Sequence, residues 1–281
     1  MAIDARRVSP FVGPLLSGSR AGCVQGVFST SFNVEFDGRI VHVGRDSDLF
    51  SCTGLSITQD DMAALAPGLV AGNIATIRDG VLRLYATMGV VEVDVNGATV
   101  VPCAVPRVPD EKSAGWAASR LAGLPLRERT GLPSSQETRR ALSALADSGS
   151  LPHAVEEAVA HLTGRGPGLT PSGDDVLLGY TCCRVAFGMG DGLADLVVRK
   201  ATGATTPVSV SYAQALAEGF INPVYRKLLC AATDCNQFEF MEAVRMIERV
   251  GHTSGIDALL GLSLGFSYVC TRAASPIHEV A

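Results

Sequence analysis

The sequence predicts an α+β protein, in which an N-terminal antiparallel β-domain is followed by a C-terminal all-α bundle. Two observations carry this prediction. Up to about residue 101, short β-branched runs are separated by turn dipeptides, and from about residue 114 the apolar residues recur at helical spacing. A proline-containing segment between them, residues 101–113, is typical of a linker. We therefore expect domains at residues 1–104 and 105–281.

The β-domain is predicted from three turn dipeptides. Asp37-Gly38 separates the runs GCVQGVFSTSFNVEF and RIVHVG, Asp79-Gly80 precedes VLRLYATM, and Asn96-Gly97 separates VVEVDV from ATVVP. Both positions of a type I′ turn need a positive φ, which Asp, Asn and Gly tolerate best. Each dipeptide therefore predicts a hairpin, and together they predict a small antiparallel sheet or barrel.

The helical domain is predicted from periodicity and from helix-start residues. Segments 136–145 and 154–162 carry apolar residues three and four positions apart, after Ser135 and Pro152 respectively. A serine suits an N-cap, and a proline suits the first turn of a helix. Similar patterns farther along predict a bundle of about eight helices.

Composition excludes several classes of protein. Hydrophobic residues make up 47% of the chain and charged residues 18%, as in a compact globular protein. The net charge is −5, and no cluster of basic and aromatic residues is present, so nucleic acid is not an expected partner. The eight cysteines lack metal-binding spacing, and we expect them to be reduced. Neither a signal peptide nor a membrane span is evident, so we expect a cytoplasmic protein without membrane partners.

One motif occurs twice in the helical half. Residues 170–179 are TPSGDDVLLG and residues 252–261 are HTSGIDALLG. The lead-in to the first copy is too rich in glycine and proline to be helical, and each copy runs into an almost uncharged apolar stretch. Each copy therefore predicts a rigid loop that enters the N-terminus of a buried helix.

Such helix starts suit a small polar ligand. Unpaired N–H groups and the positive end of the helix dipole favour anions there, and glycines allow close approach of the ligand. The expected ligand-binding residues are Gly166, Gly168, Thr170, Ser172, Gly173, Thr253, Ser254 and Gly255. The expected catalytic residues are Asp174, Asp175 and Asp257, which would position an amide or Mg²⁺, and His252, a proton carrier near neutral pH.

A purely structural interpretation remains open. Ser-Gly-x-Asp before an apolar stretch is also a good helix-capping sequence, and Leu-Leu-Gly is ordinary in helix packing. The glycines do not follow a strand, and a Walker-type lysine is missing, so neither a Rossmann nor a P-loop element is indicated. The sequence predicts no metal-ligand cluster and no certain cofactor, with Mg²⁺ as the alternative.

The combined string GRGPGLTPSGDDVLLG, followed by GHTSGIDALLG, resembles the pair of signature stretches of the AllH family. The segment VFSTSFNVEF…GRIVHVG is similar to the N-terminal part of that family. The family is named for a subunit of oxamate carbamoyltransferase, a heteromeric enzyme of allantoin breakdown. The resemblance implies a site for phosphate, carbamoyl phosphate or an oxamate-like acid, and partner subunits that complete the enzyme.

Three functions follow as hypotheses. The first is a subunit of a carbamoyl-transferring enzyme that acts on oxamate, oxalurate or a related small amide acid. The second is a non-catalytic subunit that binds a metabolite or serves assembly. The third is a Mg²⁺-dependent small-molecule phosphotransferase, although no element for adenine or triphosphate binding is evident.

Overall fold

The structure is a computed structural model that describes all residues except 48, 191 and 275–281. It confirms the α+β class, with a curled sheet in the N-terminal part and helices in the C-terminal part. Two compact units are present. One comprises Met1–Ala104 with the short segment Phe220–Pro223, and the other comprises Val105–Gly219 with Val224–Ala281. The last seven residues of the expected helical domain lie outside the described part.

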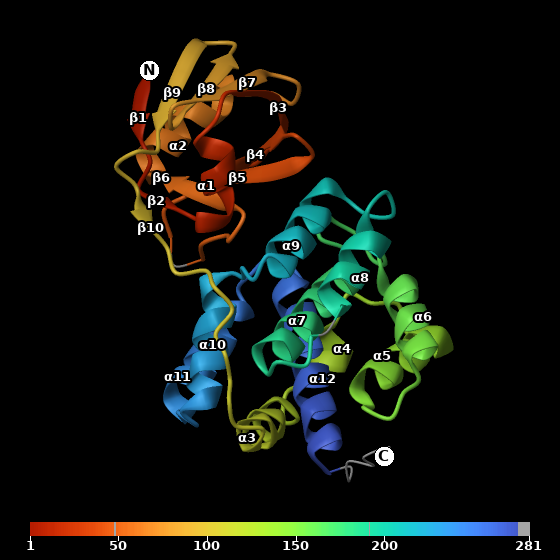
Figure 1. The fold of residues 1–281 in the computed structure, drawn as a ribbon. Helices are drawn as coiled ribbons and strands as arrows, with labels where there is room; N and C mark the ends of the chain where they lie inside the picture. Colours follow the sequence, from red (N-terminus) through yellow and green to blue (C-terminus); the bar gives the residue numbers. More distant parts are fainter. Residues whose placement is uncertain (48, 191, 275–281) are drawn as a thin grey trace. The chain divides into compact units, whose positions relative to one another are not determined.

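The first unit is built on a sheet in the order β1-β9-β8-β7-β3-β4-β5-β6-β2-β10 (Figure 1). Its described strands are β1 (Ala2–Asp4), β2 (Arg7–Val8), β3 (Arg20–Val27), β4 (Ser31–Phe36), β5 (Arg39–Arg45), β6 (Gly54–Ile57), β7 (Ile74–Arg78), β8 (Val81–Ala86), β9 (Gly89–Asp94) and β10 (Thr99–Val100). Two short helices accompany them, α1 (Gly13–Leu16) and α2 (Gln59–Leu65), with the 3₁₀ turns Pro10–Val12 and Ala66–Gly68. The apolar periodicity of the sequence does not predict these short helices.

Two consecutive residues, Ala5 and Arg6, form backbone hydrogen bonds with strands near opposite ends of the sheet. Ala5 N donates to the carbonyl of Asp94, the last residue of β9, and Arg6 N donates to the Ser56 carbonyl of β6, both at 2.8 Å. Because β9 and β6 lie near opposite ends of the strand order, the sheet must curl to meet both. Alternate residues of its strands, among them Phe32, Val34 and Val43, are fully buried in the interior.

Two of the three expected hairpins are confirmed. Asp37-Gly38 joins β4 to β5 and Asp79-Gly80 joins β7 to β8, and all four residues have a positive φ. The prediction for Asn96-Gly97 is wrong, because β9 pairs with β8 and β1 whereas β10 pairs with β2. The Asn96 side chain instead donates to the Asp79 carbonyl at 3.1 Å, so it supports the neighbouring hairpin turn.

The sheet is also not purely antiparallel. The pairs β1–β9, β2–β10 and β5–β6 are parallel, and the remaining pairs are antiparallel. None of these three pairs is joined by a tight turn, which would force antiparallel pairing.

The second unit is helical. Its described helices are α3 (Lys112–Leu121), α4 (Leu126–Arg129), α5 (Gln136–Ala146), α6 (Pro152–Leu162), α7 (Ser172–Ala186), α8 (Leu193–Ala201), α9 (Pro207–Ala217), α10 (Pro223–Thr233), α11 (Gln237–Ile247) and α12 (Ser254–Ala274). Both expected helix starts are confirmed: Ser135 Oγ accepts from Thr138 N, and Pro152 opens α6. The expected linker is held in place, since Val108 is buried and its N–H donates to the Ala186 carbonyl at 2.8 Å.

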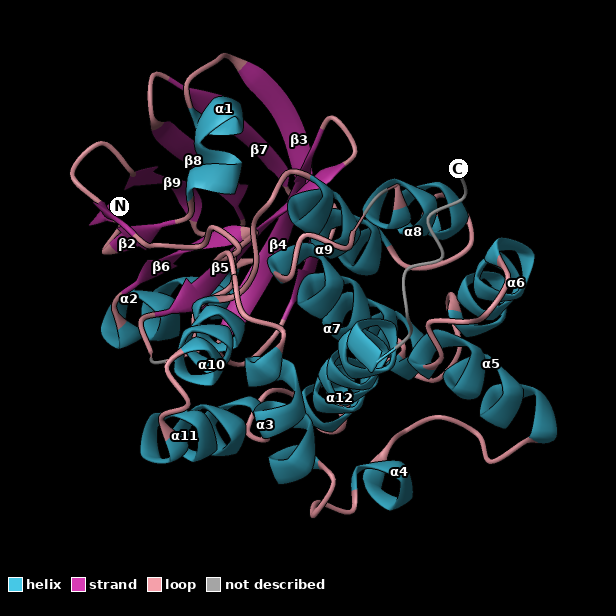
Figure 2. Cartoon of the chain, turned by 60° about the horizontal axis from the view of Figure 1, so that its bottom comes forward, coloured by secondary structure: helices cyan, strands magenta, loops and turns pink. Residues whose placement is uncertain are grey.

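Helices α7 and α12, which carry the two copies of the motif, form the closest helix pair of this unit (Figure 2). Among the described helices, α12 is the one long and apolar enough to cross a membrane, by length and composition alone. However, 72% of that stretch is buried inside the unit, as in the core helix of a folded bundle.

Candidate functional site

The glycines of the doubled motif let α7 and α12 cross in contact. A Cβ at Gly179 would overlap the Ala258 carbonyl of α12, and a Cβ at Gly261 would overlap the Val176 carbonyl of α7. These four residues occupy equivalent places in the two copies, so the contact is reciprocal. The two helices are therefore related by an approximate twofold axis, and the repeated Leu-Leu-Gly serves helix packing.

The first glycine of each copy also has a packing role. A Cβ at Gly173 would overlap the carbonyl of Leu162, the last residue of α6, and a Cβ at Gly255 would overlap that of Ile247, the last residue of α11. Each motif helix thus begins against the end of the helix before it. This arrangement brings both helix starts into the buried interior.

The backbone N–H groups that we expected to bind an anion are occupied at several of these positions. Gly173 N donates to the Arg165 carbonyl at 2.8 Å, and Gly255 N donates to the Val250 carbonyl at 3.0 Å. Asp174 N, Asp175 N and Asp257 N likewise donate to carbonyls within their own helix starts. Binding of an anion by the N–H groups of Gly173 and Gly255 therefore receives no support from this geometry.

The side chains, by contrast, leave buried oxygen atoms without a partner. Ser172 Oγ, Asp175 Oδ2 and Asp257 Oδ2 have no hydrogen bond, although the three residues are 1%, 5% and 0% exposed. An unsatisfied buried polar group costs roughly 1–3 kcal/mol. Three such atoms gathered at paired helix starts are unusual in a folded interior, where most buried polar atoms have a hydrogen-bond partner.

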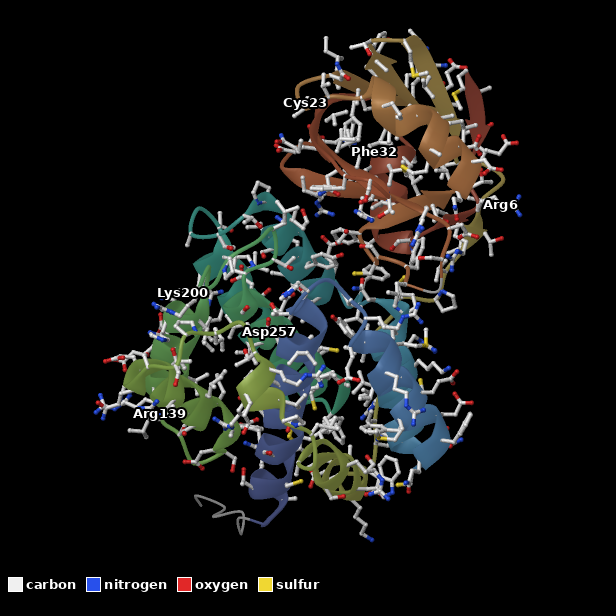
Figure 3. All side chains as sticks on the ribbon, turned by 180° about the vertical axis from the view of Figure 1, so that it is seen from behind. Arg6, Cys23, Phe32, Arg139, Lys200 and Asp257 are labelled. Carbon is white, nitrogen blue, oxygen red and sulfur yellow. The ribbon has the colours of Figure 1, made fainter. Side chains whose placement is uncertain are left out.

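Asp257 is held from one side by a third element. The Thr130 hydroxyl and Gly131 N, between α4 and α5, both donate to Asp257 Oδ1, the latter at 3.0 Å. Gly131 has no room for a side chain, because a Cβ would overlap Ser172 Oγ. Figure 3 labels Asp257, which lies on α12 in the interior of the helical unit. Sequence analysis missed Thr130 and Gly131, which lie more than a hundred residues away and carry no motif.

Asp175 lies in a different environment. Burial raises the pKa of its carboxyl well above the ordinary value, and the neighbouring carboxylates of Asp257 and Asp174 raise it further. Hydrogen bonds from the Ser254 and Thr170 hydroxyls lower the pKa and oppose this effect. These two hydroxyls are also 2.9 Å apart, which links the loop before α7 to the start of α12.

The Asp174 side chain makes its hydrogen bonds outside this cluster. Its Oδ1 accepts from Gly164 N at 2.7 Å, and its Oδ2 accepts from the Thr205 hydroxyl. It therefore connects the loop before α7 to the segment before α9. Thr206 Oγ1 accepts from Ser209 N at 3.1 Å and so caps α9.

The remaining expected residues divide into two groups. Gly166 has a positive φ and packs on Ser172, and Thr253 lies half-buried beside Gly131. Gly168 and His252 are exposed. The structure thus gathers Thr170, Ser172, Asp175, Ser254 and Asp257 into one cluster, which we call the paired helix-start site.

Neither a metal centre nor a disulfide is formed by the described residues. No three His, Cys, Asp or Glu side chains in the described part lie close enough together to hold a metal ion, so we assign no step to Mg²⁺. None of the eight cysteines, all of which are in the described part, forms a disulfide, as expected. Burial raises the pKa of the Cys182 thiol to about 12, which keeps it protonated and unreactive.

Comparison with known proteins agrees with the family suggested by the motif. The family model described as oxamate carbamoyltransferase subunit AllH matches residues 162–266. This stretch begins at the end of α6 and includes both helix starts of the site. No solved structure matches the chain. The resemblance to the AllH family is thus confirmed over residues 162–266, the segment that contains both copies of the motif.

Proposed function

We propose that this chain is a subunit of a carbamoyl-transferring enzyme, and that the paired helix-start site binds the amide or carbamoyl group of a small reactant. The match to the AllH family supports the class of enzyme. The proposed position of the binding site rests on the buried oxygen atoms of Ser172, Asp175 and Asp257 that have no hydrogen-bond partner.

The chemistry of these oxygens favours the amide end of a ligand. An ionised carboxylate only accepts hydrogen bonds, and a primary amide presents two N–H donors. A phosphate or carboxylate placed directly against the Asp257 carboxylate would instead be repelled. In a ligand such as oxamate, the amide would therefore face the two aspartates, and the acid group would lie toward the Ser172 hydroxyl, which can donate a hydrogen bond.

The enclosed setting also suits carbamoyl transfer. Fixed donors and acceptors in a buried site stabilise charge that develops on a carbamoyl oxygen without having to reorganise. The chain would contribute such groups, and a partner subunit would supply the rest of the reacting centre. A non-catalytic subunit that binds the same metabolite is the alternative, and activity of the isolated chain separates the two.

Isothermal titration calorimetry of the purified chain tests the proposal. The ligands are oxamate, carbamoyl phosphate, phosphate and MgATP, and the variants are Asp175→Asn and Ser172→Ala. We expect oxamate or carbamoyl phosphate to bind, and binding to weaken steeply in both variants. Where turnover is measurable, loss of one such group should slow it by roughly 10²–10³-fold.

Asp195→Asn is the matched control, because Asp195 also lies in the first turn of a helix, α8, but is exposed. It should bind as the wild type does. Undiminished binding and turnover in both Asp175→Asn and Ser172→Ala would remove the site from the mechanism. Binding of MgATP alone would favour a phosphotransferase.

A further inference from the structure

The two aspartates of the paired helix-start site occupy equivalent positions, but their hydrogen-bonding partners differ. Asp257 Oδ1 accepts from a hydroxyl and from a backbone N–H, both on the Thr130–Gly131 segment. The hydrogen-bonding groups next to Asp175 are the side-chain hydroxyls of Ser254 and Thr170. A backbone N–H is a fixed donor, whereas a hydroxyl both donates and accepts and turns freely between the two roles.

We propose that Asp175 holds an exchangeable proton, which reaches solvent through the Ser254 and Thr170 hydroxyls, whereas Asp257 is a fixed hydrogen-bond acceptor. The proposal rests on the proposed function only for the ligand that would receive the proton. Its other parts concern side chains of this chain and apply to the free protein.

The Ser254 and Thr170 hydroxyls lie next to Asp175 and next to each other. Ser254 Oγ and Thr170 Oγ1 are 2.9 Å apart, a hydrogen-bonding distance, and both residues are half-buried whereas Asp175 is 5% exposed. The path therefore leads from the interior to the surface over two hydroxyls. It also joins the two copies of the motif, since Thr170 precedes α7 and Ser254 opens α12.

The charges around Asp175 favour a bound proton. Two carboxylates act on it through their negative charge, Asp257 on α12 and Asp174 on its own helix. Among the described residues, no ion pair joins any of these three aspartates to a lysine, arginine or histidine. Burial and neighbouring negative charge together raise the pKa of Asp175, which supports the protonated form.

The proton transfer is balanced. When a ligand oxygen or nitrogen takes the proton, the O–H bond of Asp175 breaks and its electron pair stays on the carboxylate. Ser254 then donates its proton to Asp175 and accepts one from Thr170, which accepts one from water. One proton moves from solvent to the ligand, and no group is oxidised or reduced.

The difference between the two aspartates also defines which hydrogen-bonding groups a ligand must present to them. A protonated Asp175 donates a hydrogen bond and Asp257 Oδ2 accepts one. A neutral group with a carbonyl oxygen beside an N–H, as in a carboxamide or a ureido group, matches both at once. A symmetric anion matches only the donor.

Infrared spectroscopy of the ligand-free protein tests the proposal directly. A protonated carboxylic acid has a carbonyl band separate from those of amides and carboxylates. We expect this band at about pH 6, where an ordinary aspartate is ionised. It should disappear in Asp175→Asn and persist in Asp257→Asn. A missing band, or one that survives in Asp175→Asn, overturns the proposal.

The relay is tested by the rate at which this band shifts after transfer to D₂O. Ser254→Ala and Thr170→Val should each slow the exchange by roughly tenfold or more, because each removes a hydroxyl from the path. Ser254→Thr restores a hydroxyl and should restore the rate. Unchanged exchange in both variants overturns the relay. Since no ligand is needed, this result is independent of the titrations that test the proposed function.

Discussion

The starts of α7 and α12 are written in nearly the same residues, but only part of their structure is the same. Gly179 and Gly261 make equivalent contacts with the opposite helix, and Gly173 and Gly255 make equivalent contacts with the preceding helix. The contacts of Asp175 and Asp257 are not equivalent. The Thr130 hydroxyl and Gly131 N donate hydrogen bonds to Asp257, and no corresponding segment among the described residues donates to Asp175.

This difference separates packing from chemistry. A repeated motif can specify a symmetric helix crossing through its glycines, because each glycine packs against the backbone of the other helix at an equivalent position. The chemical character of a side chain depends instead on everything around it, including elements outside the repeat. In this protein, the Thr130–Gly131 segment supplies a hydroxyl and a backbone N–H donor to Asp257, and both come from outside the repeat.

The largest effect is expected from the symmetric part. Gly179→Ala and Gly261→Ala each place a Cβ against a backbone carbonyl of the other helix, which cannot turn away as a side chain can. We expect each variant to lose about 3 kcal/mol of unfolding free energy, measured by urea denaturation, and the two losses to be similar.

The control is Gly115→Ala in α3, where the nearest side-chain atom to a new Cβ is 3.9 Å away. This variant should be as stable as the wild type or more stable by up to about 1 kcal/mol, because alanine favours the helix. If only one of the two motif glycines were sensitive, the symmetric crossing would be contradicted.

The next effect sharpens the contrast between the aspartates. Asp257→Ala leaves the Thr130 hydroxyl and the Gly131 N–H without their acceptor, and we expect a loss of about 2 kcal/mol in unfolding free energy. Asp175→Ala removes a carboxyl that has no backbone donor, so its loss should be smaller. Equal losses in denaturation experiments near neutral pH would show that the two positions are equivalent after all.

A smaller effect concerns pH. The pKa of Asp175 is raised in the folded protein, so the folded state keeps this proton to a higher pH than the unfolded state does. Stability contributed by the proton is complete below the unfolded pKa, near 4, and is lost as the pH rises through the folded pKa.

Asp175→Asn should abolish this part of the pH dependence. At about pH 8 the variant should be more stable than the wild type, and at about pH 4 the difference should disappear. Thermal or urea unfolding over that range is the measurement. A variant less stable than the wild type at every pH would show that Asp175 is ionised and favourably bound in the native state.

The sequence predicted those features that depend on near neighbours. The hairpin turns at Asp37-Gly38 and Asp79-Gly80 and the cap at Ser135 each involve residues within a few positions, and all are confirmed. The long motif likewise identified the family over residues 162–266. Asn96-Gly97 shows the limit, because a turn dipeptide does not determine which strand its flanking strand pairs with.

The candidate site was less accessible to sequence analysis. The local sequence does not distinguish Asp174 from Asp175. Adjacent residues of a helix point in different directions, and the surroundings of each side chain depend on which other elements pack there. Asp174 meets Thr205, and Asp175 meets Ser254 from the other copy. Thr130 was missed for the same reason, because its partner Asp257 is far along the chain. The spacing of the motif predicts the two helix starts but not the Thr130–Gly131 segment that donates hydrogen bonds to one of them.

The smallest effect distinguishes these two adjacent aspartates. Thr205→Val removes the hydroxyl that donates to Asp174, and Thr170→Val removes one beside Asp175. We expect Thr205→Val to lower the unfolding free energy by about 1 kcal/mol and to leave oxamate binding unchanged in calorimetry. Thr170→Val should slow proton exchange at Asp175. If Thr205→Val weakened binding as strongly as Asp175→Asn does, Asp174 would belong to the site, and the boundary drawn between the two aspartates would have to move.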